Sequence, residues 1–146
     1  MKFNKNLLLD NLEVEQEELF KLAADKLFQE GYTRKSYLKA LVKRESVFPT
    51  GLRTKSVGVA IPHCDPVNIK KDGILVARLN KPVLFRQMGD FETKVEVYLV
   101  FFICSTGGQE QLKDLRELMA LFQDKNYLDK VYHSKNIYNT LISWKE

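Results

Sequence analysis

The chain has 146 residues, of which 45% are hydrophobic and 29% are charged. This composition is typical of one globular domain and excludes an intrinsically disordered chain, because disordered chains contain too few apolar residues to form a core. The formal net charge of +4 arises from 23 basic and 19 acidic residues that are dispersed along the sequence. Nucleic-acid-binding domains carry clustered basic residues, so the dispersed charge argues against a DNA- or RNA-binding module.

No part of the sequence has the length and apolarity of a membrane-spanning helix. The longest apolar stretch, residues 95 to 104, contains Glu96 and is about half as long as the roughly 20 residues that a span needs. The N-terminus has no small-residue cleavage site, which argues against a signal peptide. Cys64 and Cys104 do not have the spacing of a secreted disulfide framework. We therefore expect a soluble, cytoplasmic protein without membrane insertion.

Two amphipathic helices are predicted in the first third of the chain. The first covers residues 16 to 30 and ends at Gly31, where glycine is common after a helix. Its apolar positions at helical spacing include Leu19, Leu22, Ala23 and Leu27. The second helix can be capped by Thr33 and has to end before Pro49, because residues 48 to 51 have the proline and glycine content of a turn.

Four strands are predicted in the middle of the chain. They cover residues 57 to 61, 74 to 79, 83 to 85 and 95 to 104. The second and third are separated at Lys81-Pro82, because proline cannot donate a hydrogen bond inside a sheet. Residues 100 to 104 are apolar on both faces of the last strand, which indicates that this strand enters the middle of a sheet.

Two or three further helices are predicted after the last strand. The first covers residues 109 to 123, and Thr106 and Gln109 can form a capping box at its start. Shorter amphipathic segments follow at residues 124 to 132 and 136 to 144. Helices on both sides of a block of strands indicate a mixed sheet that is covered on both faces, and we expect residues 1 to 146 to form a single domain.

His63 is the main candidate for chemistry. It directly follows the strand at residues 57 to 61 and lies between Pro62 and Pro66. Each proline restricts its own backbone and that of the residue before it, so the imidazole leaves the strand on a stiff loop. A stiff loop suits a nucleophile, whose reacting atom has to be aimed. A histidine at the end of a strand can equally be a surface or structural residue, and the local pattern leaves both interpretations open.

The remaining histidine and the cysteines are weaker candidates. His133 lies in a polar stretch near a helix end, where a favourable interaction with the helix dipole explains it. A metal site formed by His63 and Cys64 is disfavoured, because adjacent residues on an extended backbone point to opposite sides. Cys64 has no identified catalytic partner, and Cys104 lies within an apolar strand as a core residue would. We therefore expect neither a metal nor a cofactor.

Arg44 can meet His63 at one end of the sheet, since one turn and one strand separate them in the chain. Its guanidinium can engage the oxygens of a phosphoryl group in pairs, and an imidazole with one unprotonated nitrogen can accept a phosphoryl group. The alternative is a solvated surface arginine. The sequence has no glycine-rich phosphate loop followed by lysine, which argues against a nucleoside triphosphate as the direct donor.

Three segments around these residues resemble a known family. They are R-E at 44 and 45, F-P-T-G at 48 to 51 and G-V-A-I-P-H-C at 58 to 64. Together they are similar to the phosphorylation-site region of the enzyme IIA domains of the bacterial sugar phosphotransferase system, in the fructose-mannitol superfamily, and most resemble the galactitol type. The similarity extends more loosely over nearly the whole chain. It implies a three-layer α/β/α sandwich with a mixed sheet of about four to five strands.

The same resemblance implies a function. His63 is expected to carry a phosphohistidine, with the phosphocarrier protein HPr as donor and a cysteine of a IIB component as acceptor, in a complex with IIC in the membrane. The transported compound is expected to be galactitol or a related polyol or sugar, although in this system the membrane component selects it. The alternative is a regulatory IIA-like protein whose phosphorylation controls a protein partner rather than transport.

One position departs from the better-known branches of the family. The mannitol and nitrogen-regulatory branches have a second active-site histidine at the start of the helix after the long strand, where this chain has Gln111. Galactitol-type proteins resemble this chain at that position. Glutamine can donate a supporting hydrogen bond but cannot supply a positive charge, so the resemblance implies that Arg44 provides more of the phosphoryl stabilisation.

Overall fold

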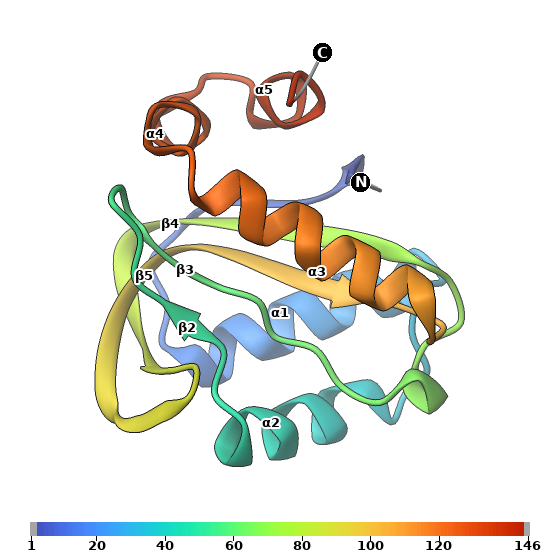
Figure 1. Ribbon diagram of the computed structural model, residues 1–146. Coiled ribbons are helices and arrows are strands. Elements are labelled where there is room, and N and C mark those ends of the chain that lie inside the picture. The colour runs from blue at the N-terminus through green and yellow to red at the C-terminus, as the bar shows by residue number, and fades with distance from the viewer. Residues whose placement is uncertain (1–2, 145–146) are drawn as a thin grey trace.

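A five-stranded mixed sheet lies between two layers of helices in the computed structural model, which describes residues 3 to 144 except for the side chain of Glu110 (Figure 1). The strands are β1 (Phe3–Leu12), β2 (Gly51–Leu52), β3 (Gly58–Ala60), β4 (Gly73–Gln87) and β5 (Asp90–Cys104). β4 pairs with β1 in parallel and with β5 in antiparallel orientation. β3 is parallel to β5, and β2 is antiparallel to β3 and meets the end of β4.

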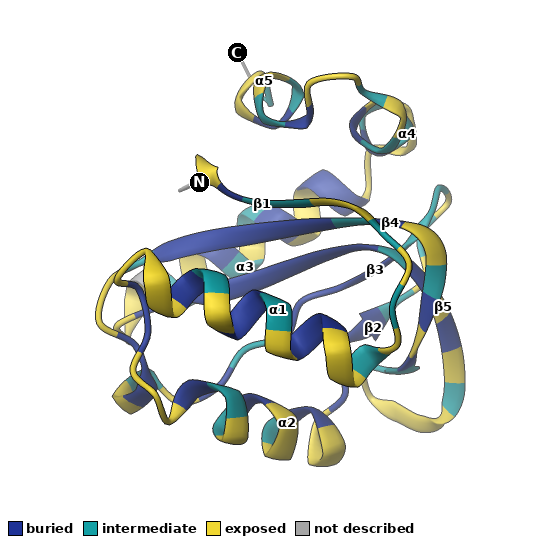
Figure 2. Cartoon of the chain, turned by 180° about the vertical axis from the view of Figure 1, so that it is seen from behind, coloured by how far each residue is buried: buried dark blue, intermediate teal, exposed yellow. Residues whose placement is uncertain are grey.

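The two faces of the sheet are covered by different helices. One face packs against α1 (Gln16–Gln29) and α2 (Tyr37–Val47), and the other against α3 (Gln109–Phe122), α4 (Lys125–His133) and α5 (Ile137–Ile142). Figure 2 shows that α1 and α2 each have a buried side and an exposed side. The predicted α/β/α sandwich is therefore confirmed. Within residues 3 to 144, no helix combines the length and apolarity that a bilayer span requires.

Aromatic rings from β5 fill both cores. The Phe102 ring lies edge-on to the Phe20 ring, with centroids 5.7 Å apart, in the layer between the sheet and α1. The Phe101 ring lies 5.3 Å from the Phe122 ring in the layer beneath α3. Adjacent residues of a strand point to opposite faces, which explains why this strand is apolar at consecutive positions.

The structure differs from the sequence prediction at two places near the N-terminus. β1 is absent from the sequence prediction, because its residues show no regular alternation and its pairing with β4 is interrupted by register shifts. Thr33 does not cap α2. It is buried and forms an isolated bridge with Ile69, while Ser36 occupies the N-cap position without a side-chain cap.

Two predictions around β4 and α3 are also wrong. Residues 74 to 79 and 83 to 85 belong to one strand, because a register shift between Arg78 and Val83 accommodates Pro82 in the pairing with β5. The capping box does not form. Gly108 is the N-cap of α3, and Thr106 instead donates from its backbone N and its Oγ1 to Asp72 Oδ1, at 2.7 and 3.0 Å.

The close approach of β3 to β5 leaves no room for a side chain at Gly58. A Cβ atom there would lie 2.1 Å from the backbone oxygen of Glu96. We expect Gly58→Ala to lower the free energy of unfolding by about 2–3 kcal/mol or more, because the obstructing atom belongs to the central sheet. Gly31→Ala is the control: it meets no atom within 4 Å and changes only a backbone with φ of +83°, for a loss of about 1 kcal/mol. Urea unfolding measures both, and equal losses would contradict the steric explanation.

Candidate active site

His63 lies in the loop between β3 and the short 3-10 helix Pro66–Asn68, and its side chain is half-buried. Its Nδ1 atom is 2.7 Å from the backbone oxygen of Ile61. A carbonyl oxygen can only accept a hydrogen bond, so we assign the ring proton to Nδ1. Nε2 of the neutral ring then carries the free lone pair.

Burial lowers the pKa of His63, and the positive charge of Arg44 lowers it further, while the hydrogen bond to Ile61 opposes this shift. The imidazole is therefore neutral at and above neutral pH. A neutral ring with a fixed tautomer is the form in which histidine acts as a nucleophile.

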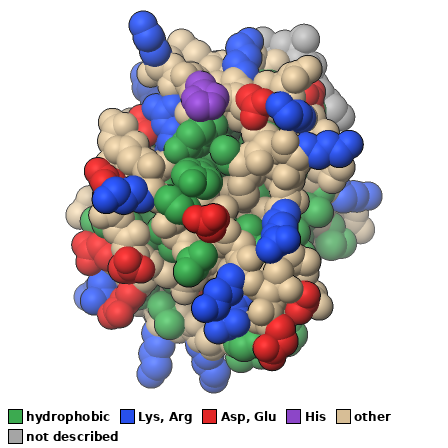
Figure 3. Space-filling model, turned by 90° about the vertical axis from the view of Figure 1, so that its left-hand side faces the viewer, with side chains coloured by type: hydrophobic (Ala, Val, Ile, Leu, Met, Phe, Trp, Pro, Cys, Tyr) green, Lys and Arg blue, Asp and Glu red, His purple; other side chains and the backbone are tan. Residues whose placement is uncertain are grey.

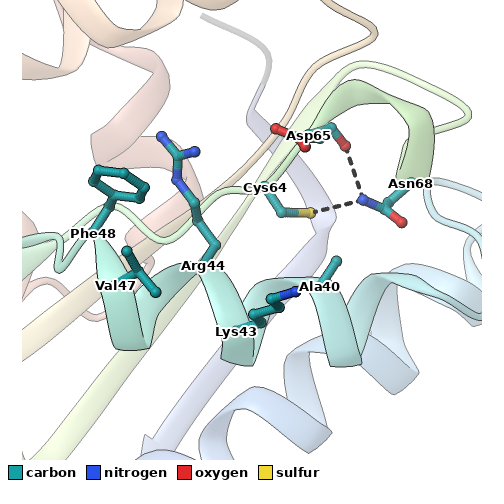
Figure 4. A pocket seen from close by; sticks show the side chains of 8 residues that line it. All are labelled: Ala40, Lys43, Arg44, Val47, Phe48, Cys64, Asp65 and Asn68. Atoms are coloured by element: carbon teal, nitrogen blue, oxygen red, sulfur yellow. Dashed lines mark hydrogen bonds between the residues drawn. The ribbon is translucent and has the colours of Figure 1, made fainter.

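Arg44 comes from the last turn of α2, and its charge acts on His63. Its guanidinium carbon lies 4.3 Å from the centroid of the Phe48 ring, which holds the side chain from one side (Figure 4). Its Nε atom is buried without a hydrogen-bond partner, and Arg44 forms no ion pair among the described residues. An unpaired buried donor costs about 1–3 kcal/mol, which an anion bound beside His63 would offset.

A hollow of about 380 Å³ lies beside Arg44 and Cys64 (Figure 4). α2 forms one wall and the loop after His63 forms the other, and the lining residues are Ala40, Lys43, Arg44, Val47, Phe48, Cys64, Asp65 and Asn68. His63 itself does not line the hollow, although Arg44 and Cys64, the residue after the histidine, do.

Asn68 stabilises the loop on the C-terminal side of His63. Its Nδ2 donates to the backbone oxygen of Asp65 at 3.1 Å and to Cys64 Sγ at 3.7 Å, as the dashed lines in Figure 4 show. Its Oδ1 accepts a hydrogen bond from Ser36 Oγ at 2.7 Å. One buried amide therefore ties the loop to the start of α2.

Glu45 was expected only as part of the R-E segment, and the structure gives it a specific position. Its carboxylate accepts hydrogen bonds from the backbone N and the Oγ1 of Thr50, at 2.7 and 2.8 Å. Burial raises the pKa of Glu45 to about 7, although both hydrogen bonds oppose this shift. The signal in the sequence was an acidic residue on the buried stripe of α2, which Tyr37 and Leu41 begin.

Gln111 lies in the first turn of α3 and is half-buried. The loop before α3 is adjacent to the His63 loop, since a Cβ on Gly107 would lie 3.4 Å from Cγ of Pro66. Among the described residues, no hydrogen bond joins Gln111 to His63 or Arg44. The structure thus brings His63 and Arg44 together and places Gln111 on a neighbouring element.

His133 is separate from this site. It lies at the C-terminal end of α4 and lines a hollow of about 620 Å³ with Tyr98, Tyr132 and the residues that precede β3, whereas His63 follows β3. Figure 3 shows a histidine side chain above a band of hydrophobic side chains on one face of the molecule. The Tyr132 and His133 rings pack edge to face with centroids 5.2 Å apart.

The two cysteines are buried and free. Burial raises the pKa of Cys64 to about 11 and that of Cys104 to about 12. Both thiols are therefore protonated at neutral pH and are poor nucleophiles. Within the described part of the chain, no three His, Cys, Asp or Glu side chains are placed to bind one metal ion.

Comparisons with known proteins identify the family of this chain. A family model described as "Phosphoenolpyruvate-dependent sugar phosphotransferase system, EIIA 2" matches residues 1–143. The galactitol-specific EIIA component of the PTS system of Escherichia coli (strain K12) is 30% identical over 116 residues, which are 80% of this chain and 77% of that protein.

Solved structures share the fold. The crystal structure of IIA mannitol from Escherichia coli has a TM-score of 0.78 at 20% identity, with 98% of each chain covered. The Escherichia coli complex of enzyme IIAMTL with phosphorylated enzyme IIBMTL gives a TM-score of 0.76 at 20% identity, covering 97% of this chain and 96% of that one. With the family match over nearly its whole length, the chain belongs to the EIIA 2 family of the phosphoenolpyruvate-dependent sugar phosphotransferase system.

Proposed function

We propose that this protein is a phosphoryl carrier in which Nε2 of His63 accepts a phosphoryl group from phospho-HPr and passes it to a cysteine of a IIB component. The observation that carries the proposal is the neutral imidazole with Nδ1 bound to the Ile61 carbonyl, beside the unpaired guanidinium of Arg44. One relative with the same fold forms a complex with a phosphorylated IIB enzyme, which supports the choice of acceptor.

The transported compound is proposed from the relative of known specificity. The 30% identical protein from Escherichia coli is a galactitol-specific EIIA component. We therefore assign this protein to the uptake of galactitol or a related polyol or sugar, together with a IIC component in the membrane.

The proposed transfer has two steps. In the first, the Nε2 lone pair attacks the phosphorus of phospho-HPr, the bond between phosphorus and the HPr histidine breaks, and its electron pair stays on that histidine. The phosphorylated His63 ring keeps its Nδ1 proton and is cationic, and the Ile61 carbonyl that accepts this proton stabilises the charge. In the second step a IIB thiolate attacks phosphorus, and the Nε2–P electron pair returns to the ring.

Arg44 is proposed to stabilise the phosphoryl group during both steps. The transition state of phosphoryl transfer spreads negative charge over three oxygens, and a guanidinium can donate to two of them at once. Gln111, in the first turn of α3, is proposed to add one neutral hydrogen bond.

Both partners are proposed to dock on the same exposed apolar surface. Large apolar side chains are exposed on three segments near His63: Phe48 by 57%, Val67 by 75% and Leu112 by 60%. Donor and acceptor have to approach one imidazole nitrogen in line with the bond that breaks, so they cannot use separate surfaces.

The central prediction concerns the two histidines. His63→Ala is expected to abolish the uptake of labelled phosphate from phospho-HPr, whereas the matched variant His133→Ala keeps it, because Nδ1 of His63 is bound to the Ile61 carbonyl and the ring lies beside Arg44. Acid-labile, base-stable label on the protein is the measurement. Label on His63→Ala would refute the assignment. Label on the wild type that passes to no IIB component would favour the regulatory alternative.

The docking surface is tested by a charge on its most exposed residue. Val67→Glu is expected to weaken the binding of both HPr and IIB about 10-fold, since loss of a central apolar contact costs more than about 1 kcal/mol. Leu84→Glu is the matched control, because Leu84 is 54% exposed but lies on the distant part of β4. NMR titration gives both dissociation constants. Weakening of only one partner would show that the two use different surfaces.

The roles of Arg44 and Gln111 are separated by single-turnover transfer from phospho-HPr. Arg44→Ala is expected to slow transfer far more than Gln111→Ala, because charge-assisted hydrogen bonds are worth about 1.5–3 kcal/mol against roughly 0.5–1.5 for neutral ones. Arg44→Lys recovers only part of the rate, since a point charge cannot make the two-pronged contact. Gln111→His keeps activity. If Arg44→Ala transfers within a factor of about three of the wild type, Arg44 has no role in transfer.

A further inference from the structure

Glu45 is an acidic residue with a buried side chain. Its side chain belongs to a residue only 7% exposed, and no ion pair involves it among the described residues. Burying a carboxylate is costly unless its oxygens are hydrogen-bonded. Here both oxygens are used, and both bonds come from Thr50. Neither Glu45 nor Thr50 touches Nε2 of His63. Both can therefore affect this atom only through the residues that they hold.

A continuous series of hydrogen bonds runs from Glu45 to the imidazole. The carboxylate holds Thr50, whose backbone oxygen accepts from the backbone N of Ile61 at 3.3 Å. The backbone oxygen of Ile61 in turn accepts from His63 Nδ1 at 2.7 Å. The residue that sets the tautomer of His63 is therefore itself held by Thr50.

Thr50 has little freedom to shift. It is 2% exposed, and the next residue, Gly51, pairs with the end of β4. A Cβ on Gly51 would lie 2.7 Å from the backbone oxygen of Arg86, so the two backbones are in close contact. Hydrogen bonds to Glu45 hold Thr50 on one side, and the close contact of Gly51 with β4 limits its movement on the other.

We propose that Glu45 and Thr50 are positioning residues for His63: they hold Ile61 so that its carbonyl keeps the proton on Nδ1 and directs Nε2 outward. This inference rests on the proposed function for its kinetic consequence, because Nε2 is there the atom that accepts phosphate. The two residues act by geometry and not by the charge of the carboxylate.

The substitutions distinguish geometry from charge. Glu45→Ala removes both acceptors, and Thr50→Val removes one donor while keeping the shape of the side chain. Glu45→Gln removes the charge but can keep both contacts, since its amide oxygen accepts from the Thr50 backbone N and its amide nitrogen donates to the Thr50 hydroxyl. Thr50→Ser keeps both donors.

The first readout is the tautomer of His63, measured from the ¹⁵N chemical shifts of the ring at pH 8. The chain has two histidines, so His133→Ala assigns the spectrum. We expect the wild type, Glu45→Gln and Thr50→Ser to show protonated Nδ1. Glu45→Ala and Thr50→Val are expected to show a mixture of tautomers. Thr50→Val keeps the inference testable if Glu45→Ala does not fold.

The second readout is single-turnover transfer from phospho-HPr. Glu45→Ala and Thr50→Val are expected to transfer about 10–100-fold more slowly, the range typical of groups that orient a histidine through one further bond, and Glu45→Gln within about 3-fold of the wild type. Asp124→Ala, which removes the N-cap of α4, is the control for lost stability alone.

The tautomer and the transfer rate together test whether Glu45 and Thr50 position His63. A mixture of tautomers with slower transfer, rescued in Glu45→Gln, supports it. The inference is overturned if Glu45→Ala and Thr50→Val keep the wild-type tautomer, whether or not transfer is slower. It is also overturned if Asp124→Ala slows transfer to the same extent. If the wild-type protein accepts no phosphate from HPr, the proposed function fails, while the NMR measurement still tests the positioning of His63.

Discussion

The antiparallel pairing of β4 and β5 supports every other element of the fold. The two strands pair from Gly73 opposite Cys104 to Gln87 opposite Asp90. β1 adds to one side of this pair and β3 to the other, and both helical layers pack on its faces. Because side chains alternate across a strand, a slip of one residue would exchange the two cores.

This pair of strands also determines where the site lies. β3 runs parallel to β5, so both strands end at the same edge of the sheet. His63 follows β3 at that edge, and the last turn of α2 brings Arg44 to it. The loop itself is held by side chains, with Glu45 acting before the histidine through Thr50 and Asn68 acting after it. The arrangement places the proposed reactive loop on a rigid scaffold.

Features with a local cause were predictable from the sequence. The ends of α1 and α2 are confirmed because Gly31 and Pro49 act on their own neighbourhood. The meeting of His63 with Arg44 followed from one short turn and one strand. β1 was not predictable in this way, since its partner in the sheet lies more than 60 residues away and its own pattern is irregular.

Side-chain partners were the least predictable part. Thr33 and Thr106 are residue types that favour helix caps, yet tertiary contacts with Ile69 and Asp72 replace that role. Glu45 differs from its expected environment in another way. Its acidic side chain indicates a surface position, and only the folded backbone shows the two donors of Thr50 that allow its burial.

The burial of Glu45 couples its protonation to folding. In the unfolded chain this carboxyl ionises near its ordinary pKa of 4.5, whereas the folded protein raises the pKa to about 7. Its contribution to stability is complete below 4.5 and is lost as the pH rises through about 7, since the folded state retains a proton that the unfolded state has released. His63, whose pKa is lowered by burial, is already neutral at neutral pH. The loop that carries the proposed nucleophile is therefore less stable at the pH values at which that nucleophile is neutral, so stability and the proposed reactivity are favoured at different pH values.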